Sequence, residues 1–287
     1  MTNKAIKRVV GSAKAQVGDG FPLRRALPAP GLDMLDPFLM LDHAGPVRIA
    51  PSEIQKGVDE HPHKGFETVS IAYQGDLEHR DSFGHAGFIP AGGVQWMTAG
   101  SGLVHEEKHG KEFSRQGGTL EMIQLWVNLP KEYKNTKPAY QDIMPDRIPV
   151  VKLDEQGSYL RVIAGQYGDT LGPAETFTPI NMLDLRLKAG AKLRLPLPDS
   201  YSTGIYTVNG KVAYNGGQSI SEGFFAIFEE AGEQIEIQAE ADTTLLLLNG
   251  QPIDEPVVSY GPFVMNTQEE IREAFREFRA GKMGSLA

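Results

Sequence analysis

The sequence predicts an all-β protein, and three observations carry that prediction. Segments of alternating apolar and polar residues recur along the chain, as in Glu67–Tyr73 and Gly204–Val208. Glycine or proline interrupts them about every 8–12 residues, which is typical of a sandwich or barrel. The 32 glycines and 19 prolines among 287 residues follow no fixed period, which favours many short strands with tight turns over a low-complexity chain.

Most of the predicted strands are short and end at a turn signal. Asn209-Gly210 is the strongest of these signals, because this dipeptide readily forms the tight turn that joins two adjacent antiparallel strands. The predicted strands are Glu67–Tyr73, Leu77–Arg80, Gln124–Asn128, Asp184–Leu187, Lys192–Leu195, Gly204–Val208, Lys211–Tyr214, Phe224–Phe228 and Thr244–Leu248.

The C-terminal segment is the one clear helical pattern. Asn266-Thr267 can cap a helix, acidic residues follow in its first turn, and Gly281 can end it. Apolar residues recur at helical spacing and would form one face that packs on a barrel. These residues are Ile271, Ala274, Phe275 and Phe278.

The chain divides into two halves with related patterns. We expect one domain over residues 1–135 and a second over 136–287, which ends in the helix, with the polar, proline-containing stretch 130–154 as a linker. At an offset of 135 residues, His61 and His63 align with Pro196 and Pro198. All seven histidines lie at or before His109, so the second domain is expected to lack an imidazole metal site.

Composition and charge exclude several classes of function. Hydrophobic residues make up 40% of the chain and charged residues 23%, the balance of a globular protein with a core. The absence of cysteine excludes disulfides, thiolate metal sites, iron–sulfur clusters and cysteine nucleophiles. The net charge of −9 repels a phosphate backbone, so direct nucleic-acid binding is not expected.

Membrane insertion is not expected either. The best apolar run, Thr243 to Leu248, is far too short to span a bilayer, and the N-terminal segment has no apolar core of a signal peptide. These features favour a cytoplasmic protein without a membrane partner.

Two short motifs present potential metal ligands. In His61-Pro62-His63, the proline favours an extended chain, in which residues i and i+2 point to the same side. His105-Glu106-Glu107 repeats this geometry with an imidazole and a carboxylate. On neighbouring strands, the two motifs would direct three nitrogens and one oxygen to one point, a set that suits a first-row transition metal. Spacing alone leaves open that these are surface or core histidines.

The segment between the motifs resembles the pirin family of the cupin superfamily. The resemblance rests on HPH-x-GFETV, on the run GGVQWMTAGSG and on the H-x-E that follows it. It extends to DPFLMLDH, QLWVNLP and GPFVMNT, and thus to nearly the whole chain. It implies a bicupin, that is, two stacked cupin (jelly-roll) β-barrels with a C-terminal α-helix, and iron in the N-terminal barrel.

The resemblance also implies the ligands. In pirins they come from HPH and H-x-E, and these positions are His61, His63, His105 and Glu107 in this chain. Other cupins take their carboxylate from the position of Glu67, which we expect either to orient a ligand imidazole or to be a strand residue. Fe(II) is the expected ion, although these ligands also accept Mn, Ni, Cu, Co or Zn.

Other residues near the motifs remain open. His79 is expected to face solvent or to make structural hydrogen bonds rather than reach the site, and His85 and His109 are expected to be exposed. Trp96 and Met97 either line a pocket or pack in the core.

Three functions compete. Some pirins resemble dioxygenases that open quercetin-type flavonols with O2 and release CO, which implies a small aromatic enol or flavonol substrate, with Glu107 as general base. The alternative is an iron-dependent, redox-sensing regulator that binds a transcription factor or a metabolic enzyme. A cupin isomerase or decarboxylase is the third. The native metal, the physiological substrate and the oligomeric state stay open.

Overall fold

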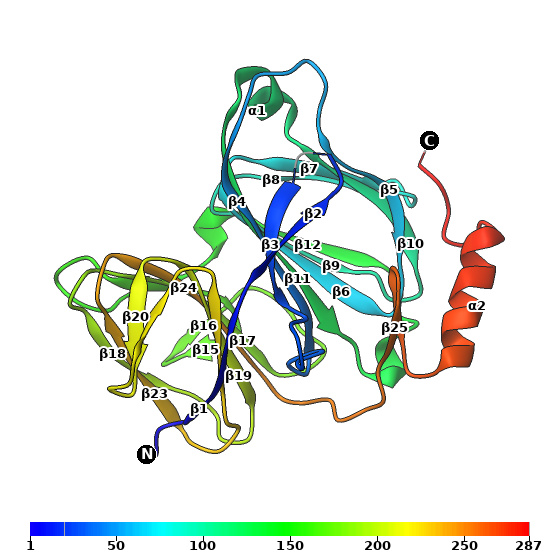
Figure 1. The fold of residues 1–287 in the computed structure, drawn as a ribbon. Helices are drawn as coiled ribbons and strands as arrows, with labels where there is room; N and C mark the ends of the chain where they lie inside the picture. Colours follow the sequence, from blue (N-terminus) through cyan, green and yellow to red (C-terminus); the bar gives the residue numbers. More distant parts are fainter. Residues whose placement is uncertain (20, 287) are drawn as a thin grey trace. The chain divides into compact units, whose positions relative to one another are not determined.

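The computed structural model describes residues 1–19 and 21–286, and the all-β prediction is confirmed. Contacts divide the chain into two compact units (Figure 1). The first unit comprises 14–24, 40–145 and 254–287, and the second comprises 1–13, 25–39 and 146–253. Each unit is built mainly from one seven-stranded and one four-stranded antiparallel sheet.

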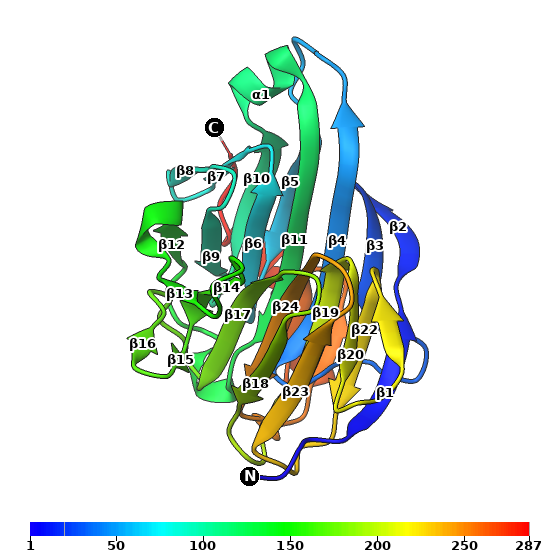
Figure 2. The same cartoon turned by 90° about the vertical axis from the view of Figure 1, so that its left-hand side faces the viewer.

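In the first unit, the larger sheet has the order β12-β9-β6-β11-β4-β3-β2, and the smaller has the order β5-β10-β7-β8. Figure 2 shows β6, β11 and β4 edge to edge. The bounds are β2 Ala13–Val17, β3 Phe21–Leu27, β4 Phe38–Ile49, β5 Gly57–His63, β6 Phe66–Gln74, β7 Leu77–Asp81, β8 Ala86–Ile89, β9 Val94–Thr98, β10 Leu103–His109, β11 Gly118–Asn128 and β12 Ala139–Ile143. The short helix α1, Lys111–Gln116, follows β10.

In the second unit, the orders are β1-β22-β19-β24-β17-β14-β13 and β18-β23-β20-β21. The bounds are β1 Ile6–Gly11, β13 Val150–Lys152, β14 Tyr159–Ala164, β17 Ile180–Leu187, β18 Lys192–Pro196, β19 Ser202–Asn209, β20 Lys211–Tyr214, β21 Ser219–Ser221, β22 Phe224–Phe228, β23 Gln234–Ala239 and β24 Thr243–Gly250. Two-stranded pairs account for the remaining strands: β15 Gln166–Tyr167 with β16 Thr170–Leu171, and β25 Val258–Tyr260 with β26 Phe263–Met265.

The two units repeat one topology. Each strand from β4 to β11 has a counterpart thirteen strands later, at the same place in the equivalent sheet. This repeat agrees with the alignment of His61 with Pro196, since β5 and β18 are counterparts. His61 pairs with His105 across β5 and β10, whereas Pro196 pairs with Gln234 across β18 and β23.

The units differ from the predicted domains, 1–135 and 136–287, at both ends of the chain. The N-terminal β1 pairs with β22 and so belongs to the second unit. The C-terminal segment belongs to the first unit, where β26 bridges from Phe263 to Lys64. The predicted linker 130–154 carries β12 and β13, which are the edge strands of the two larger sheets. A sequence pattern cannot reveal such exchanges, because they depend on pairing between distant strands.

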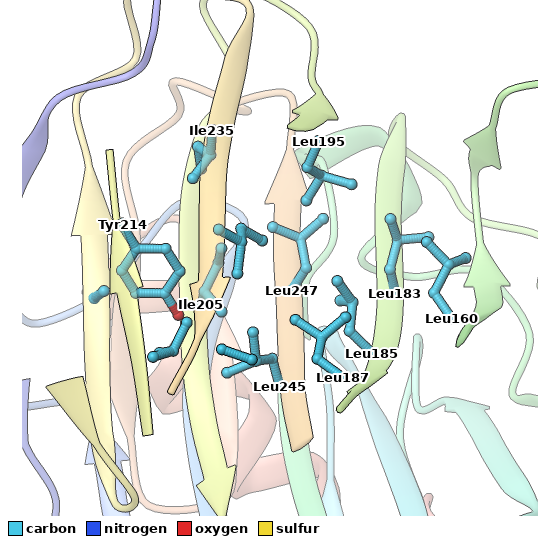
Figure 3. Close-up of a cluster of buried hydrophobic side chains, with 14 of the residues drawn as sticks. Leu160, Leu183, Leu185, Leu187, Leu195, Ile205, Tyr214, Ile235, Leu245 and Leu247 are labelled. Carbon is cyan, nitrogen blue, oxygen red and sulfur yellow. The ribbon is translucent and has the colours of Figure 1, made fainter. Parts of the chain in front are cut away.

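Apolar side chains fill the second unit. Leu185, Leu247 and Leu195 come from three strands and meet in one buried cluster, in which every labelled side chain of Figure 3 takes part. Burial of this kind contributes about 25 cal/mol per Å² of apolar surface, so the barrel interior has a structural role.

The helix α2, Gln268–Arg279, begins as predicted. Thr267 caps it, with its side chain accepting from the backbone N–H of Glu270, while the Glu270 carboxylate accepts from the backbone N–H of Thr267. Ile271 and Ala274 are buried in a cluster with Phe263, and Figure 1 shows α2 beside β25. No helix of the described residues has the length and apolarity needed to cross a membrane.

Candidate metal centre

Strand pairing brings the two histidine motifs together. β5 and β10 are antiparallel, with His61 opposite His105 and His63 opposite Leu103. The register shifts between His105 and Glu107, where Glu107 pairs with Val58. Irregularities of this kind are common next to functional sites.

Three imidazoles converge at this point. One ligand atom from each of His61, His63 and His105 lies within 4.8 Å of the other two, and this is the one such group of His, Cys, Asp or Glu side chains in the described chain. The Nε2 atoms of His61 and His105 are 3.0 Å apart. The Nδ1–H of His61 donates to the carbonyl of Asp59 at 2.8 Å, which leaves Nε2 as the ring nitrogen that faces His105.

This geometry fits a metal ion. Two imidazole nitrogens bound at about 2.1 Å and at right angles to each other lie about 3.0 Å apart. Two facing nitrogen lone pairs would repel each other without a proton or a cation between them, and a divalent ion satisfies both. The three histidines therefore form a site that could hold a transition metal.

Burial keeps two of the imidazoles neutral. Removal from water, followed by the neighbouring His61, lowers the pKa of His63 well below its ordinary value. The same cause, with His63 and His61 next, lowers the pKa of His105 well below its ordinary value. Neutral imidazole is the form that binds metals, so both rings are ready as ligands at neutral pH.

Glu107 lies on the same face of β10 as His105 but outside the group of three ligand atoms. Its carboxylate oxygen Oε1 lies 3.3 Å from the Ser70 hydroxyl, which in turn is 2.6 Å from the Gln124 side-chain oxygen. Burial raises the pKa of Glu107, while His61 and the hydrogen bonds from Ser70 and Gln124 lower it. The carboxylate is thus held beside the histidines by two polar residues of β6 and β11.

An aromatic wall borders the cluster, and the motifs did not reveal it. The His63 ring lies 5.1 Å from Phe66 and 5.4 Å from Trp126, centroid to centroid, and these two rings are 4.3 Å apart. Both residues follow the strand alternation that places Ser70 and Gln124 on the same face. The alternation of the strand residues could have predicted both rings from the sequence. Once one residue is known to face the histidines, every second residue of the same strand faces them too.

Glu67 lies on the opposite face of β6 from Ser70 and Phe66. Its carboxylate accepts a hydrogen bond from Thr98 at 2.8 Å, and burial raises its pKa to about 7. Glu67 was expected either to orient a ligand imidazole or to be a strand residue, and these contacts support the second role. Trp96 shares the face of Glu67 and is core, whereas Met97 shares the inner face.

The remaining histidines differ in part from expectation. As whole residues, His79 and His109 are 4% and 1% exposed, which corrects the prediction that His109 is exposed and the expectation that His79 could face solvent. His85 is about half exposed, as predicted, and its Nδ1 lies 3.0 Å from an Asp81 oxygen. His43 is buried within β4, between Arg24 and Glu121.

Two buried lysines hold the turn that follows His63, and neither was predicted. The Lys64 ammonium donates to the Ser101 carbonyl at 2.8 Å and pairs with Glu277 of α2 at 3.0 Å. The Lys134 ammonium donates to the Gly65 carbonyl at 2.8 Å and the Val264 carbonyl at 3.1 Å. These contacts fix the end of β5 and therefore the position of the His63 ring.

Comparisons with known proteins agree with this architecture. The family model "Pirin" matches residues 20–127, and the model "Pirin C-terminal cupin domain" matches residues 182–284. A Pseudomonas aeruginosa protein named "Putative quercetin 2,3-dioxygenase" is 45% identical over 97% of this chain and 98% of its own length. Human "Pirin" is 36% identical over 99% of this chain and 95% of its own length.

Solved structures give the same result. A crystal structure titled as quercetin 2,3-dioxygenase from Acinetobacter baumannii is 46% identical, covers 99% of this chain and 100% of its own, and superposes with a TM-score of 0.97. The bacterial pirin of Escherichia coli in complex with nickel(II) shares the fold at 22% identity, a TM-score of 0.64, and coverage of 85% and 99%. The bicupin fold predicted from the resemblance is confirmed.

Proposed function

Because this chain belongs to the pirin family, we propose that it is a metal-dependent dioxygenase that opens quercetin-type flavonols with O2 and releases CO. One observation carries the proposal: three buried or half-buried imidazoles present ligand atoms within 4.8 Å of one another. The names of the relatives from P. aeruginosa and A. baumannii support the choice of substrate. The first unit is the proposed catalytic domain.

His61, His63 and His105 are the proposed metal ligands, with Glu107 as the fourth. Fe(II) is the first ion to test, followed by Mn, Co, Cu, Zn and Ni, since nickel accompanies the E. coli pirin. When bound, a redox-active ion of this set would supply Lewis acidity for the chelating oxygens of a flavonol and a redox centre for O2, whereas Zn would supply the Lewis acidity alone. The Asp59 carbonyl and the neighbouring aromatic rings of Phe66 and Trp126 keep the imidazoles oriented and exclude water.

Glu107 is the proposed general base. Burial raises the pKa of its carboxylate towards the range where it can take a proton from the 3-hydroxyl group of a flavonol and later return it. Ser70 and Gln124 hold that carboxylate beside the histidines, so the proton acceptor is positioned before substrate arrives.

The test is aerobic turnover of quercetin by protein loaded anaerobically with each metal, with CO measured in the headspace. We expect CO in proportion to the quercetin consumed. Glu107→Gln should lower kcat about 10²–10⁴-fold, the usual contribution of a general base. Metal content is measured in Glu107→Gln and in the comparison variant His105→Ala, because Glu107 is a proposed ligand as well as the base. A loss of kcat in Glu107→Gln at unchanged metal content is assigned to the base, whereas His105→Ala should lose metal and activity together. If none of Fe, Mn, Ni, Cu or Co yields CO, the proposal is wrong.

A regulatory role is the second candidate. The net charge of −9 supports it, because an acidic protein is suited to bind a basic surface of a partner protein. In this reading, the oxidation state of the bound metal changes a surface. The test is to compare the partner proteins captured by the Fe(II) form and by the Fe(III) form. Partner binding that does not change with the oxidation state contradicts redox sensing.

A further inference from the structure

A buried histidine inside the first unit has no role in the function proposed above. His79 pairs with Glu107 across β7 and β10, and Asp81 pairs with His105. Cross-strand partners share a face of the sheet, so His79 faces the same interior as Glu107. Its side chain is 1% exposed.

The His79 ring is packed but not hydrogen-bonded. It stacks on Tyr140 of β12, with ring centroids 4.7 Å apart and an interplanar angle of 26°. Neither ring nitrogen hydrogen-bonds to any described residue, and the nearest carboxylate oxygen, on Asp142, is 3.8 Å from Nε2, beyond hydrogen-bonding distance. Leaving a buried polar group without a hydrogen bond costs about 1–3 kcal/mol. We therefore expect a hydrogen-bonding group from outside the described residues to bind this ring.

Gly87 makes the room for this arrangement. A Cβ atom at that position would lie 2.2 Å from His79 Nε2 and 2.9 Å from an Asp142 carboxylate oxygen. The backbone of Gly87 does not have a positive φ, so space rather than conformation accounts for the glycine.

The chemistry of the pair fits a hydroxyl group. Burial lowers the pKa of His79, with Asp142 opposing it, so the ring is neutral and offers one donor and one acceptor. A ligand hydroxyl can both donate and accept. The stacked Tyr140 ring adds an aromatic surface, and burial followed by Asp81 raises its pKa, so its phenol keeps its proton.

We propose that His79, held by stacking on Tyr140 and by the space at Gly87, is a specificity residue that recognises a ring hydroxyl of the aromatic ligand bound at the histidine cluster. The inference rests on the proposed function and narrows its substrates to polyhydroxylated flavonols. A simple flavonol would chelate the metal equally well but leave His79 without a partner.

The test compares two ligands on Zn(II)-loaded protein without O2, so that binding is measured apart from turnover. Quercetin has ring hydroxyls, whereas 3-hydroxyflavone keeps the chelating oxygens without them. We expect His79→Phe, which preserves stacking, to raise the Kd of quercetin about tenfold and that of 3-hydroxyflavone by less than about twofold. His79→Gln keeps a donor and an acceptor and should recover part of the discrimination.

Two further variants guard against misfolding and packing effects. Gly87→Ala should lose the same discrimination, because its methyl group displaces the His79 ring. His85→Phe is the matched control, since His85 also contacts Tyr140, at 5.5 Å, but is half exposed and should leave both Kd values unchanged. If His79→Phe affects the two ligands equally, or affects neither, His79 does not recognise a ring hydroxyl of the ligand. That result would overturn this inference and leave the proposed function intact. A wild type that binds neither ligand overturns the flavonol substrate as well.

Discussion

At the scale of single residues, burial determines which side chains can do chemistry. His63 and His105 lose water, their pKa values fall, and they become neutral ligands. Glu67 and Glu107 undergo the opposite change, because burial raises the pKa of a carboxyl group. Only Glu107 faces the histidines, so the same physical effect has a proposed catalytic consequence at one residue and a stability consequence at the other.

The stability consequence is testable with Glu67→Gln. Folding raises the pKa of Glu67 from 4.5 to about 7, so the native state binds more protons than the unfolded state between these values. This contribution to stability is complete below pH 4.5 and is lost as the pH rises through 7. We expect the wild type to lose up to about 3 kcal/mol of unfolding free energy from this group over that range.

Urea unfolding of both proteins between pH 4.5 and 8 measures this effect. The Glu67→Gln variant should lack that part of the pH dependence, and its metal content should equal that of the wild type because Glu67 faces away from the site. Parallel pH profiles, or a loss of metal, contradict the assignment.

At the scale of strands and helices, the sequence predicted the site well where local geometry decides it. The i, i+2 spacing of His61 and His63 is a strand property, so the motif alone predicted that both rings share a face, as they do. Tyr140 was missed because it lies on an edge strand within a polar, proline-containing segment, and its contact with His79 depends on long-range pairing. Lys134 lies in a turn of the same polar segment, and it was missed because its contacts with Gly65 and Val264 are long-range.

The helix α2 offers a test of a local prediction. Thr267→Ala removes the side-chain acceptor of the capping box and should lower the unfolding free energy by about 1 kcal/mol. Thermal or urea unfolding measures it. Arg272→Ala is the control, because its ion pair with Glu269 is exposed to solvent and contributes little to stability. Equal losses in the two variants would show that the cap has no special role.

At the scale of the whole molecule, the two units share one topology but differ in their interiors. The weak repeat in the sequence predicted that the second copy lacks the histidines, and the strand pairing of Pro196 with Gln234 agrees with it. The interior of that unit is filled by leucine and isoleucine side chains. The placement of the chain ends was not predictable in this way. The N-terminal β1 belongs to the unit formed mainly by the second half of the chain, and the C-terminal α2 belongs to the unit formed mainly by the first half. We therefore expect a single metal-binding unit per chain.

The metal content of the purified protein tests this account most directly. After anaerobic reconstitution with Fe(II) and removal of free ions, elemental analysis should give about one ion per chain, as three imidazoles in one barrel predict. The variants His63→Ala and His105→Ala should each retain the fold by circular dichroism and lose the ion. Full metal content in both variants, or two ions per wild-type chain, would contradict the assignment of the site to His61, His63 and His105.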